Sequence, residues 1–526
     1  MFIWAGSINP KYISGGPDKY KPPTKAKQDL LDEFVKNSSK DLLDLIISVN
    51  EDKLIPYRAT LYSILACALN SEAITDKIKP EITATVLKIC KSDEEFFDFI
   101  KYITTLRQKK CKFSTSVGKT VRQFYNRKTA LDLVHSYAKY KGYHSWTHKD
   151  LIKLGHVNTK ATLKGVVVSY ILKKEIIEYE PATEAQQLLD TLKKAELLRR
   201  TSDHILAVSI IPDMKATINQ VEPCLRKSAE VWNAVLPNMS LSEVLRSLPK
   251  LYKLGFLKRD TPTQILINGF LTNAEKNKGK RNSSDRSMYS YEKLRKRKLD
   301  PKFVEHLEKD MKLTDEEIRK KYPAEAKCPI IINNLQKCMT VACSNVQPLG
   351  KRYMVTIDVT DKRDIGCLHN KNITGLEAAV AFTMALLKVE KNVTVAVYKD
   401  RDIVVGQFYE HVQKLRQHNS LFLTPSASIV WASTQKKHID IFYNFIHHKE
   451  YHVTIPINHR DKIIKPAVAL ERYRKKLNLP NTKLISFCMS SPHLTFANGS
   501  QNLLDVAGLD TGVPKAVEAF CRGNFC

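Results

Sequence analysis

Residues 137–156 read YAKYKGYHSWTHKDLIKLGH, a stretch that mixes Lys and His with Tyr and Trp and holds a single Asp. Such a mixture suits an anionic polymer with stackable bases, because Lys side chains neutralise phosphates and unstacked bases lie on aromatic rings. A solvated helix–turn–helix, with its Trp and Leu side chains in a core, would have the same composition. The remainder of the chain has to decide between these two interpretations.

The chain as a whole is strongly basic. Its 526 residues include 84 Lys and Arg against 55 Asp and Glu, which gives a formal net charge of +29. A field of this sign attracts nucleic acids or acidic membrane surfaces. The length allows two or three domains, and no run of 18 apolar residues is present to span a membrane. The sequence therefore favours a nucleic acid as partner and predicts no membrane association.

The amino terminus and the cysteines indicate the compartment. The segment MFIWAGSINPKYISGG has no basic region ahead of a long apolar one, so a secretory signal is not predicted. The eleven Cys residues are scattered and form no CxxC pair. Reduced thiols in a cytoplasmic or nuclear protein explain this usage better than a disulfide framework.

Residues 29–346 are predicted to be a series of short amphipathic helices, after an extended lead-in at residues 1–28. Ser92 with Glu95 and Ser240 with Glu243 form capping boxes ahead of apolar runs. One helix face is made by residues at i, i+3, i+4 and i+7, namely Leu61, Ile64, Leu65 and Ala68. Further helices are expected near 119–141, 149–154, 162–177 and 184–198. Helices in such numbers, with little β alternation, are typical of an α-solenoid.

A basic insertion interrupts this region at residues 274–300. Between Lys276 and Lys298 there are ten basic and two acidic residues. The segment is interpreted as a flexible loop or a nuclear-targeting patch, with an RNA contact as the alternative. Residues 347–350 are interpreted as a linker.

The pattern becomes β-α in residues 351–526. Apolar strands are predicted at 353–359, 393–398, 439–445 and 483–489, with helices at 373–389, 407–417, 426–436 and 463–477. Buried strands that alternate with helices form a parallel sheet covered on both faces, a Rossmann-like α/β domain. Ligands of such sheets bind at the carboxyl ends of the strands, where Asp358 lies.

The loop at Asp358 is a candidate magnesium site. Asp358, Thr360 and Thr424 offer the hard oxygen ligands that Mg²⁺ prefers. Lys362 and Asn444, however, stand where a hydroxyl and a carboxylate would be needed. We therefore expect no required cofactor and a doubtful metal site, in which the Lys362 ammonium pairs with Asp358 in place of the ion.

No catalytic motif stands out. The run VGKT at 117–120 has only the last part of a phosphate-binding loop, and neither GxSxG nor HExxH occurs. His144 and His148 are spaced as a zinc pair could be, but they have no evident third ligand, so a satisfied or solvated role is favoured. The paired carboxylates of a nuclease are not visible. The sequence predicts a protein that is not an enzyme.

Basic residues also precede the opening stretch. Lys119, Arg122 and Asn126 lie at i, i+3 and i+7 and can share one helix face, which leaves Phe124 and Tyr125 to pack in the core. Cations on a solenoid surface focus the field that attracts phosphates. The candidate RNA-binding residues are Lys139, His156, Lys119, Arg122, Lys141, Tyr143 and Lys149.

Several segments resemble the Ro/SS-A ribonucleoprotein family. WTHKDLIKLGH (146–156) and SAEVWNAVLPNMSLSEVLRSLPKL (228–251) resemble its helical TROVE module. LGKRYMVTIDV (349–359), KPAVALERYRKKLNLPNTKLISFCM (465–489) and LLDVAGLDTG (503–512) resemble its von Willebrand A domain. The resemblance keeps the order of both domains and covers almost the whole chain.

The resemblance implies a ring of HEAT-like helical repeats closed by the A domain. It also implies binding of small Y-type RNAs on the outer surface and of the 3′ ends of misfolded non-coding RNAs in the central hole. Lys139 and His156 match positions that contact RNA in the family, whereas Tyr143 replaces an Arg. The family's metal site maps onto Asp358, Thr360 and Thr424. An RNA-binding ribonucleoprotein component is thus the predicted function, and a protein-interaction scaffold acting through the A domain is the alternative.

Overall fold

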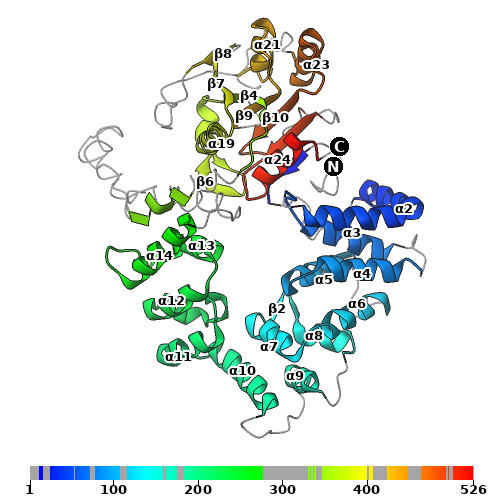
Figure 1. Cartoon of the computed structure of the whole chain (residues 1–526), viewed down its shortest axis with the longest axis vertical. Coiled ribbons are helices and arrows are strands. Elements are labelled where there is room, and N and C mark those ends of the chain that lie inside the picture. The colour runs from blue at the N-terminus through cyan, green and yellow to red at the C-terminus, as the bar shows by residue number, and fades with distance from the viewer. Residues whose placement is uncertain are drawn as a thin grey trace. The chain divides into compact units, whose positions relative to one another are not determined.

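The computed structural model describes residues 11–15, 24–52, 54–71, 77–106, 115–157, 162–173, 183–276, 330–331, 333–335, 337–338, 346–399, 402–406, 423–447, 464–492, 496 and 502–524. Figure 1 draws the chain with its elements labelled. The chain divides into two compact units. Unit 1 comprises Met1–Arg226, Gly499–Gln501 and Gly512–Cys526, and unit 2 comprises Lys227–Asn498 and Asn502–Thr511. The predicted domain boundaries, at 29–346 and 351–526, stay predictions.

Unit 1 is built almost entirely of helices. Its elements are β1 (Lys11–Ile13), α2 (Lys25–Glu51), α3 (Ala59–Asn70), α4 (Lys79–Ile89), α5 (Asp93–Leu106), α6 (Thr115–Asn126), α7 (Ala130–Lys139), β2 (Gly142–Tyr143), β3 (Trp146–Thr147), α8 (His148–Leu154), α9 (Leu163–Leu172), α10 (Glu184–Leu198), α11 (His204–Met214), η1 (Ile218–Gln220) and α24 (Val513–Arg522). Neighbouring helices pack in a regular succession, α3 on α5, α4 on α6 and α6 on α8. This is the stacking expected of helical repeats.

Local sequence signals place the helices where they were predicted. The predicted face of α3 is buried along its whole length. The capping box of α5 forms, because the Ser92 amide donates to Glu95 Oε2 at 3.0 Å and the Glu95 amide donates to Ser92 Oγ at 3.3 Å. One prediction was wrong: residues 119–141 form two helices. Thr129 caps α7 by accepting from the Asp132 amide, which ends the continuous pattern after α6.

The 3₁₀ helix η2 (Pro223–Lys227) crosses the boundary between the two units. Unit 2 continues with α12 (Ala229–Val235), η3 (Leu236–Asn238), α13 (Leu241–Lys253) and α14 (Pro262–Lys276). The predicted capping box of Ser240 and Glu243 opens α13. Both α12 and α13 contact α14, and Trp232 is buried among them. The predicted basic insertion at 274–300 lies, from residue 277 onward, outside the described residues.

The rest of unit 2 is a doubly wound sheet. Its strands are β4 (Arg352–Ile357), β7 (Asn392–Lys399), β8 (Asp402–Val405), β9 (Ile441–Ile446), β10 (Lys483–Cys488) and β11 (Leu503–Ala507), in the order β11-β10-β9-β4-β7-β8. The pairs β11–β10, β10–β9, β9–β4 and β4–β7 are parallel. The edge strand β8 runs antiparallel to β7, which the prediction of a parallel sheet missed. A separate hairpin, β5 (Gly366–Cys367) with β6 (Asn370–Thr374), follows the turn η5 (Asp361–Asp364).

Helices cover both faces of this sheet. On one face, α21 (Ala427–Thr434) and α23 (Pro466–Leu477) enclose a core with Met354, Phe442 and Leu484. On the other face, Phe382 of α19 (Gly375–Val389) lies 6.1 Å from the ring of Phe445 and 5.8 Å from that of Phe487. The predicted helix at 407–417 lies outside the described residues. The predicted fold class, a helical-repeat region followed by an α/β Rossmann-like domain, is confirmed.

The connection order creates a crevice at one edge of the sheet. The chain leaves β4 toward β7 on one side and later adds β9 on the other side, so the strand order reverses at β4. Ligands of doubly wound sheets bind at the carboxyl ends of strands at such a point. Asp358 and His447 follow β4 and β9 there, and the Asp358 amide donates to Phe445 O at 3.0 Å. Within the described residues, no helix has the length and apolar character needed to cross a membrane.

Candidate nucleic-acid interface

The hairpin β2–β3 forms the middle of the stretch 137–156. Its two-residue turn, His144 and Ser145, has φ of 53° and 69°, the left-handed pair of a type I′ turn. Gly142 is required beside it, because a Cβ there would lie 2.0 Å from the Trp146 carbonyl oxygen. The sequence analysis predicted no strand here, since neither His nor Ser is a usual type I′ residue.

Tyr143 projects from β2 into an aromatic group. Its ring centroid lies 5.4 Å from that of Phe97 and 4.7 Å from that of Tyr140, and the side chain is half-buried. Burial, together with the neighbouring Tyr140, Glu94 and Asp93, raises the pKa of Tyr143 well above its ordinary value. The ring is therefore a neutral surface with one part accessible, suited to stacking rather than to binding a phosphate.

Two of the three histidines in residues 137–156, His144 and His148, contact neighbouring protein side chains. His144 Nε2 lies 2.7 Å from Asp98 Oδ1. His148 is fully buried, and its Nδ1 lies in hydrogen-bond contact with Tyr125 Oη at 2.8 Å. Burial lowers the pKa of His148 to about 4, so the ring is neutral at pH 7. The buried His148 Nε2 has no hydrogen-bond partner in the part of the chain that the structure describes, so the prediction of satisfied or solvated histidines stays a prediction.

His156 ends α8 in a strained conformation. Its φ is 50°, its amide donates to Lys153 O at 3.2 Å, and the Val157 amide donates to Ile152 O at 3.1 Å. This is the position at which helices normally place Gly, and a side chain with Cβ costs about 1–2 kcal/mol in the left-handed region. The imidazole is exposed. Such strain at an exposed residue is compatible with a functional requirement for the side chain.

The helices α6 and α8 are in close contact. A Cβ on Gly155 would lie 2.6 Å from Val121 Cγ1, so α8 rests directly on α6. Across this contact, Arg122 Nε donates to the Gly155 carbonyl oxygen at 3.0 Å. Arg122, a predicted RNA contact, thus uses one of its donors to hold the end of α8.

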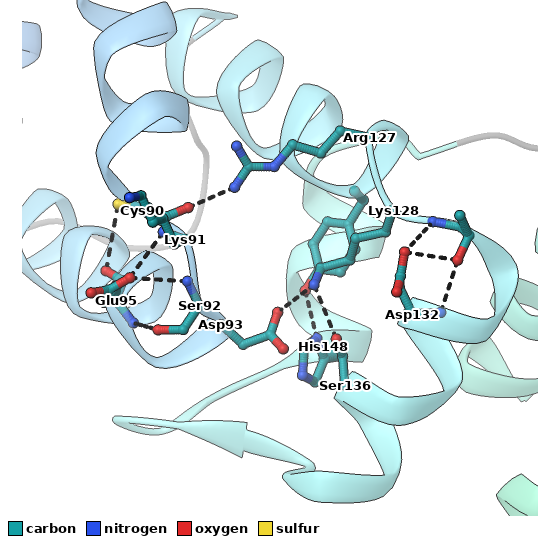
Figure 2. A network of polar contacts seen from close by, with 12 residues as sticks. Cys90, Lys91, Ser92, Asp93, Glu95, Arg127, Lys128, Asp132, Ser136 and His148 are labelled. Atoms are coloured by element: carbon teal, nitrogen blue, oxygen red, sulfur yellow. Dashed lines mark hydrogen bonds and ion pairs between the residues drawn. The ribbon is translucent and has the colours of Figure 1, made fainter. Parts of the chain in front are cut away.

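Two basic residues at the end of α6 are structural. Figure 2 shows Arg127 reaching back to the carbonyl oxygen of Cys90 just after α4, to which it donates at 2.6 Å. Arg127 also donates to the carbonyl oxygen of Leu87. Lys128 lies 3.0 Å from Asp93 Oδ1 and 3.0 Å from Ser136 Oγ. The positively charged groups of Arg127 and Lys128 are therefore engaged in contacts within the protein.

The other predicted cations are accessible. Lys119 on α6, Lys139 at the end of α7 and Lys141 beside the hairpin are exposed, and Lys149 in the first turn of α8 is half-buried. The sequence analysis did not single out Lys153, which is exposed and follows Lys149 at i+4. Helical spacing on α8 was the signal that could have found it.

Acidic residues do little to offset these cations. Residues 115–157, which we call the α6–α8 region, contain eight Lys or Arg and two Asp. Asp132 and Asp150 each accept from the backbone and hydroxyl of a capping Thr, at Thr129 and Thr147. Hydrogen bonds from Thr129 lower the pKa of Asp132. Both carboxylates thus serve helix amino termini and leave the surface cations in excess.

At the crevice of the sheet, the polar groups face one another. Asp358 Oδ1 accepts from the Thr360 amide at 2.8 Å, and Oδ2 accepts from the His447 amide at 3.2 Å. His447 Nε2 lies 2.9 Å from the Asp358 carbonyl oxygen. The ring is fully buried, and burial lowers its pKa. A Cβ on Gly375 would lie 2.5 Å from His447 Nδ1, so α19 begins against this ring.

These residues do not fit a divalent cation. Asn444 is neutral and occupied, because its Nδ2 donates to Pro425 O at 2.8 Å and its Oδ1 accepts from Ser428 Oγ at 3.1 Å. The buried hydroxyls of Thr356 and Thr424 and the Nδ1 atom of His447 have no hydrogen-bond partner in the part of the chain that the structure describes. No group of three His, Cys, Asp or Glu able to hold a metal occurs within these residues. The side chain of Lys362 lies outside them, so its pairing with Asp358 stays a prediction.

Stacked helices followed by a doubly wound sheet, with Asp358 at the point where the strand order reverses, define a helical-repeat protein with a von Willebrand A-like domain. Comparison with known proteins narrows this class. The Ro60 vWA domain family matches residues 352–521. The crystal structure of the Deinococcus radiodurans Ro (RSR) protein has the same fold, with a TM-score of 0.79 at 18% identity over 99% of this chain and 98% of that one.

Two curated relatives cover most of the chain. The RNA-binding protein RO60 of Deinococcus radiodurans is 21% identical over 73% of this chain and 68% of its own length. The RNA-binding protein RO60 of Caenorhabditis elegans is 22% identical over 83% of this chain and 72% of its own length. The predicted resemblance to the Ro family is therefore confirmed, and residues 352–521 match that family's A domain.

Proposed function

We propose that this chain is an RNA-binding protein, not an enzyme, and that it binds RNA through the α6–α8 region. The observation that carries the proposal is the excess of accessible cations there, since both acidic residues of the region are engaged in capping boxes. Affinity then arises from the release of counterions from the RNA as its phosphates meet Lys and Arg. Two relatives named as RNA-binding proteins support this conclusion.

The residues divide into two roles. Lys119, Lys139, Lys141 and Lys149, with the remaining donors of Arg122, supply positive charge to phosphates. The half-exposed ring of Tyr143 and the imidazole of His156 supply flat surfaces for unstacked bases. Lys153 extends the cationic set on α8.

The identity of the RNA follows from the family resemblance. We infer small structured Y-type RNAs and the 3′ ends of misfolded non-coding RNAs as ligands, in a ribonucleoprotein that serves RNA quality control in the cytoplasm or nucleus. Tyr143 in place of an Arg exchanges one phosphate contact for a stacking contact. The affinity for RNA is therefore expected to depend less on salt concentration in this protein than in relatives that carry Arg at this position.

The test is the salt dependence of binding by the full chain to a stem-loop RNA with a single-stranded 3′ tail. Contacts with six to ten phosphates predict a loss of affinity of roughly 10³–10⁵-fold between 50 and 200 mM salt. The α6–α8 variant, Lys119→Gln/Lys139→Gln/Lys149→Gln, should bind more weakly and with a shallower salt slope. The control variant, Lys36→Gln/Lys40→Gln/Lys88→Gln, changes the net charge equally on α2 and α4. A binding curve that is flat across this salt range would contradict the proposal.

The alternative, a scaffold whose A domain recognises a partner carboxylate through a metal, is less well supported. It needs a ligand set that Asp358 alone does not provide, because Asn444 is neutral and already hydrogen-bonded. We therefore expect no metal requirement in binding.

A further inference from the structure

The A domain has a second basic surface, at the edge of the sheet opposite the Asp358 crevice. In a doubly wound fold the helices run antiparallel to the strands, so helix carboxyl ends and strand amino ends meet at one edge. Here that edge consists of residues 349–352, 386–392, 431–441 and 474–483, which we call the amino-end edge. Lys476 Nζ of α23 donates to Ser433 O of α21 at 3.0 Å, so the ends of these two helices lie together.

The amino-end edge has an excess of positive charge. The amino-end edge carries ten Lys or Arg and two acidic residues. This excess of positive charge is what a bound polyanion would neutralise.

Both acidic residues of the amino-end edge are engaged locally. Asp440 Oδ1 pairs with Arg352 Nη2 at 2.7 Å and its Oδ2 accepts from Arg352 Nε at 3.0 Å. Glu390 accepts from the amides of Leu349 at 2.6 Å and Gly350 at 3.0 Å. Neither carboxylate forms an ion pair with Lys391, Lys436 or Lys475 in the part of the chain that the structure describes.

The ends of the helices account for only part of this charge. The carboxyl ends of α19, α21 and α23 each carry about half a negative charge, or roughly 1.5 charges together. Lys476 and Arg474 already donate hydrogen bonds to carbonyl oxygens at this edge. Arg474 Nε donates to Thr482 O at 3.0 Å. Lys391, Lys436 and Lys475 are exposed and exceed what the helix ends need.

The arrangement fits an extended polyanion better than a small one. The strands β7, β4, β9 and β10 contribute in turn, so the cations spread over about 15 Å, three spacings of a sheet. A single phosphate could contact only a few of them. Trp431, half-buried at the same edge with Lys437 Nζ 5.8 Å from its ring, adds an aromatic surface.

We propose that the amino-end edge of the A domain is a second RNA-binding surface, which contacts the phosphate backbone of the RNA that the α6–α8 region binds. This inference rests on the proposed function. Each lost phosphate contact lowers the slope of log affinity against log salt by about 0.7 for a single strand. Loss of three contacts should therefore lower the slope by about 2.

The test uses the full chain and the stem-loop RNA with a 3′ tail. The edge variant is Lys391→Gln/Lys436→Gln/Lys475→Gln, and the control is Lys36→Gln/Lys40→Gln/Lys88→Gln. We expect the edge variant to lose about 2 from the salt slope while the control keeps the wild-type slope. Equal slopes for edge variant and control overturn the inference. Circular dichroism confirms that both variants are folded.

Two outcomes separate this inference from the proposed function. If wild-type binding is flat in salt, the proposed function itself fails. If the α6–α8 variant loses affinity but the edge variant matches the control, only the second surface fails. Photocrosslinking with 4-thiouridine RNA gives an independent measurement. Crosslinks in the peptide that contains Trp431 support the second surface, and crosslinks confined to residues 115–157 overturn it.

Discussion

The α6–α8 region and the Asp358 crevice were both singled out from sequence, yet they treat their polar groups in opposite ways. In the α6–α8 region, carboxylates cap helices and the cations Lys119, Lys139 and Lys141 remain at the surface. At the crevice, Asp358 and Asn444 are hydrogen-bonded to neighbouring protein groups. The difference shows that a binding surface is recognised by the charged groups that remain accessible after the other polar groups have formed hydrogen bonds within the protein.

The largest expected effect tests whether the hairpin holds the α6–α8 region in shape. Gly142→Ala places a Cβ 2.0 Å from the Trp146 carbonyl oxygen, so we expect a loss of roughly 3 kcal/mol in local stability and weaker RNA binding. Gly118→Ala is the control, since its Cβ would be no closer than 4.0 Å to any neighbour and should stabilise α6 by about 0.5–1 kcal/mol. Hydrogen exchange of residues 115–157 measures both. Equal protection in the two variants would argue against the clash.

The next largest expected effect is a loss of stability at low pH, caused by the buried His148 of the α6–α8 region. Burial lowers its pKa in the folded state to about 4, below the ordinary value of 6.5. The unfolded chain therefore binds the proton first, and the stability from the neutral ring, complete above pH 6.5, is lost as the pH falls from 6.5 toward 4. At pH 5 the loss is about 2 kcal/mol. Urea unfolding at pH 7 and pH 5 should show this difference in wild type and a smaller one in His148→Gln.

A smaller effect separates strain from binding at His156. His156→Gly should stabilise the end of α8 by about 1 kcal/mol, because Gly adopts positive φ without steric cost. The same substitution should weaken RNA binding several-fold if the imidazole contacts RNA. Asp260→Gly, at another residue with positive φ and outside both proposed RNA-binding surfaces, is the control that should not weaken binding. Thermal unfolding and RNA titration give the two readings, and unchanged affinity in His156→Gly would remove this residue from the interface.

At the Asp358 crevice we expect no tight binding of Mg²⁺. Isothermal titration calorimetry of the full chain with Mg²⁺ should detect no tight binding, and Asp358→Ala should not alter the result. The carboxylate has two backbone donors, and Asn444 provides no second negative charge. Tight binding that Asp358→Ala abolishes would reverse the comparison between the two regions.

Sequence reasoning located elements well wherever local signals decide. Capping boxes at Ser92 and Ser240 and the apolar period of α3 are short-range features, and the structure contains them. Asp358 lies at the end of β4 because a continuous apolar run defines that strand. The seven RNA-binding residues stay predictions that the accessibility of Lys119, Lys139 and Lys141 supports.

The rest depended on partners far apart in sequence. Arg127 belongs to the structure because the carbonyl oxygens of Leu87 and Cys90 lie beside it, and nothing near residue 127 indicates this. The hairpin has an unusual turn sequence at His144 and Ser145, and β8 is too short for its direction to be inferred. Charge counted along the sequence therefore does not separate Arg127 and Lys128, which contact other protein groups, from the exposed Lys153.

The contact of Gly155 with Val121 has a consequence for the energetics of binding. With no side chain between α6 and α8, the cations on the two helices keep a fixed separation in the unbound protein. The RNA binding proposed for this region would then require little ordering of the backbone, so less of the favourable free energy would be lost on binding. The hydrogen atom of Gly155, in place of a methyl group, thus sets the spacing between α6 and α8.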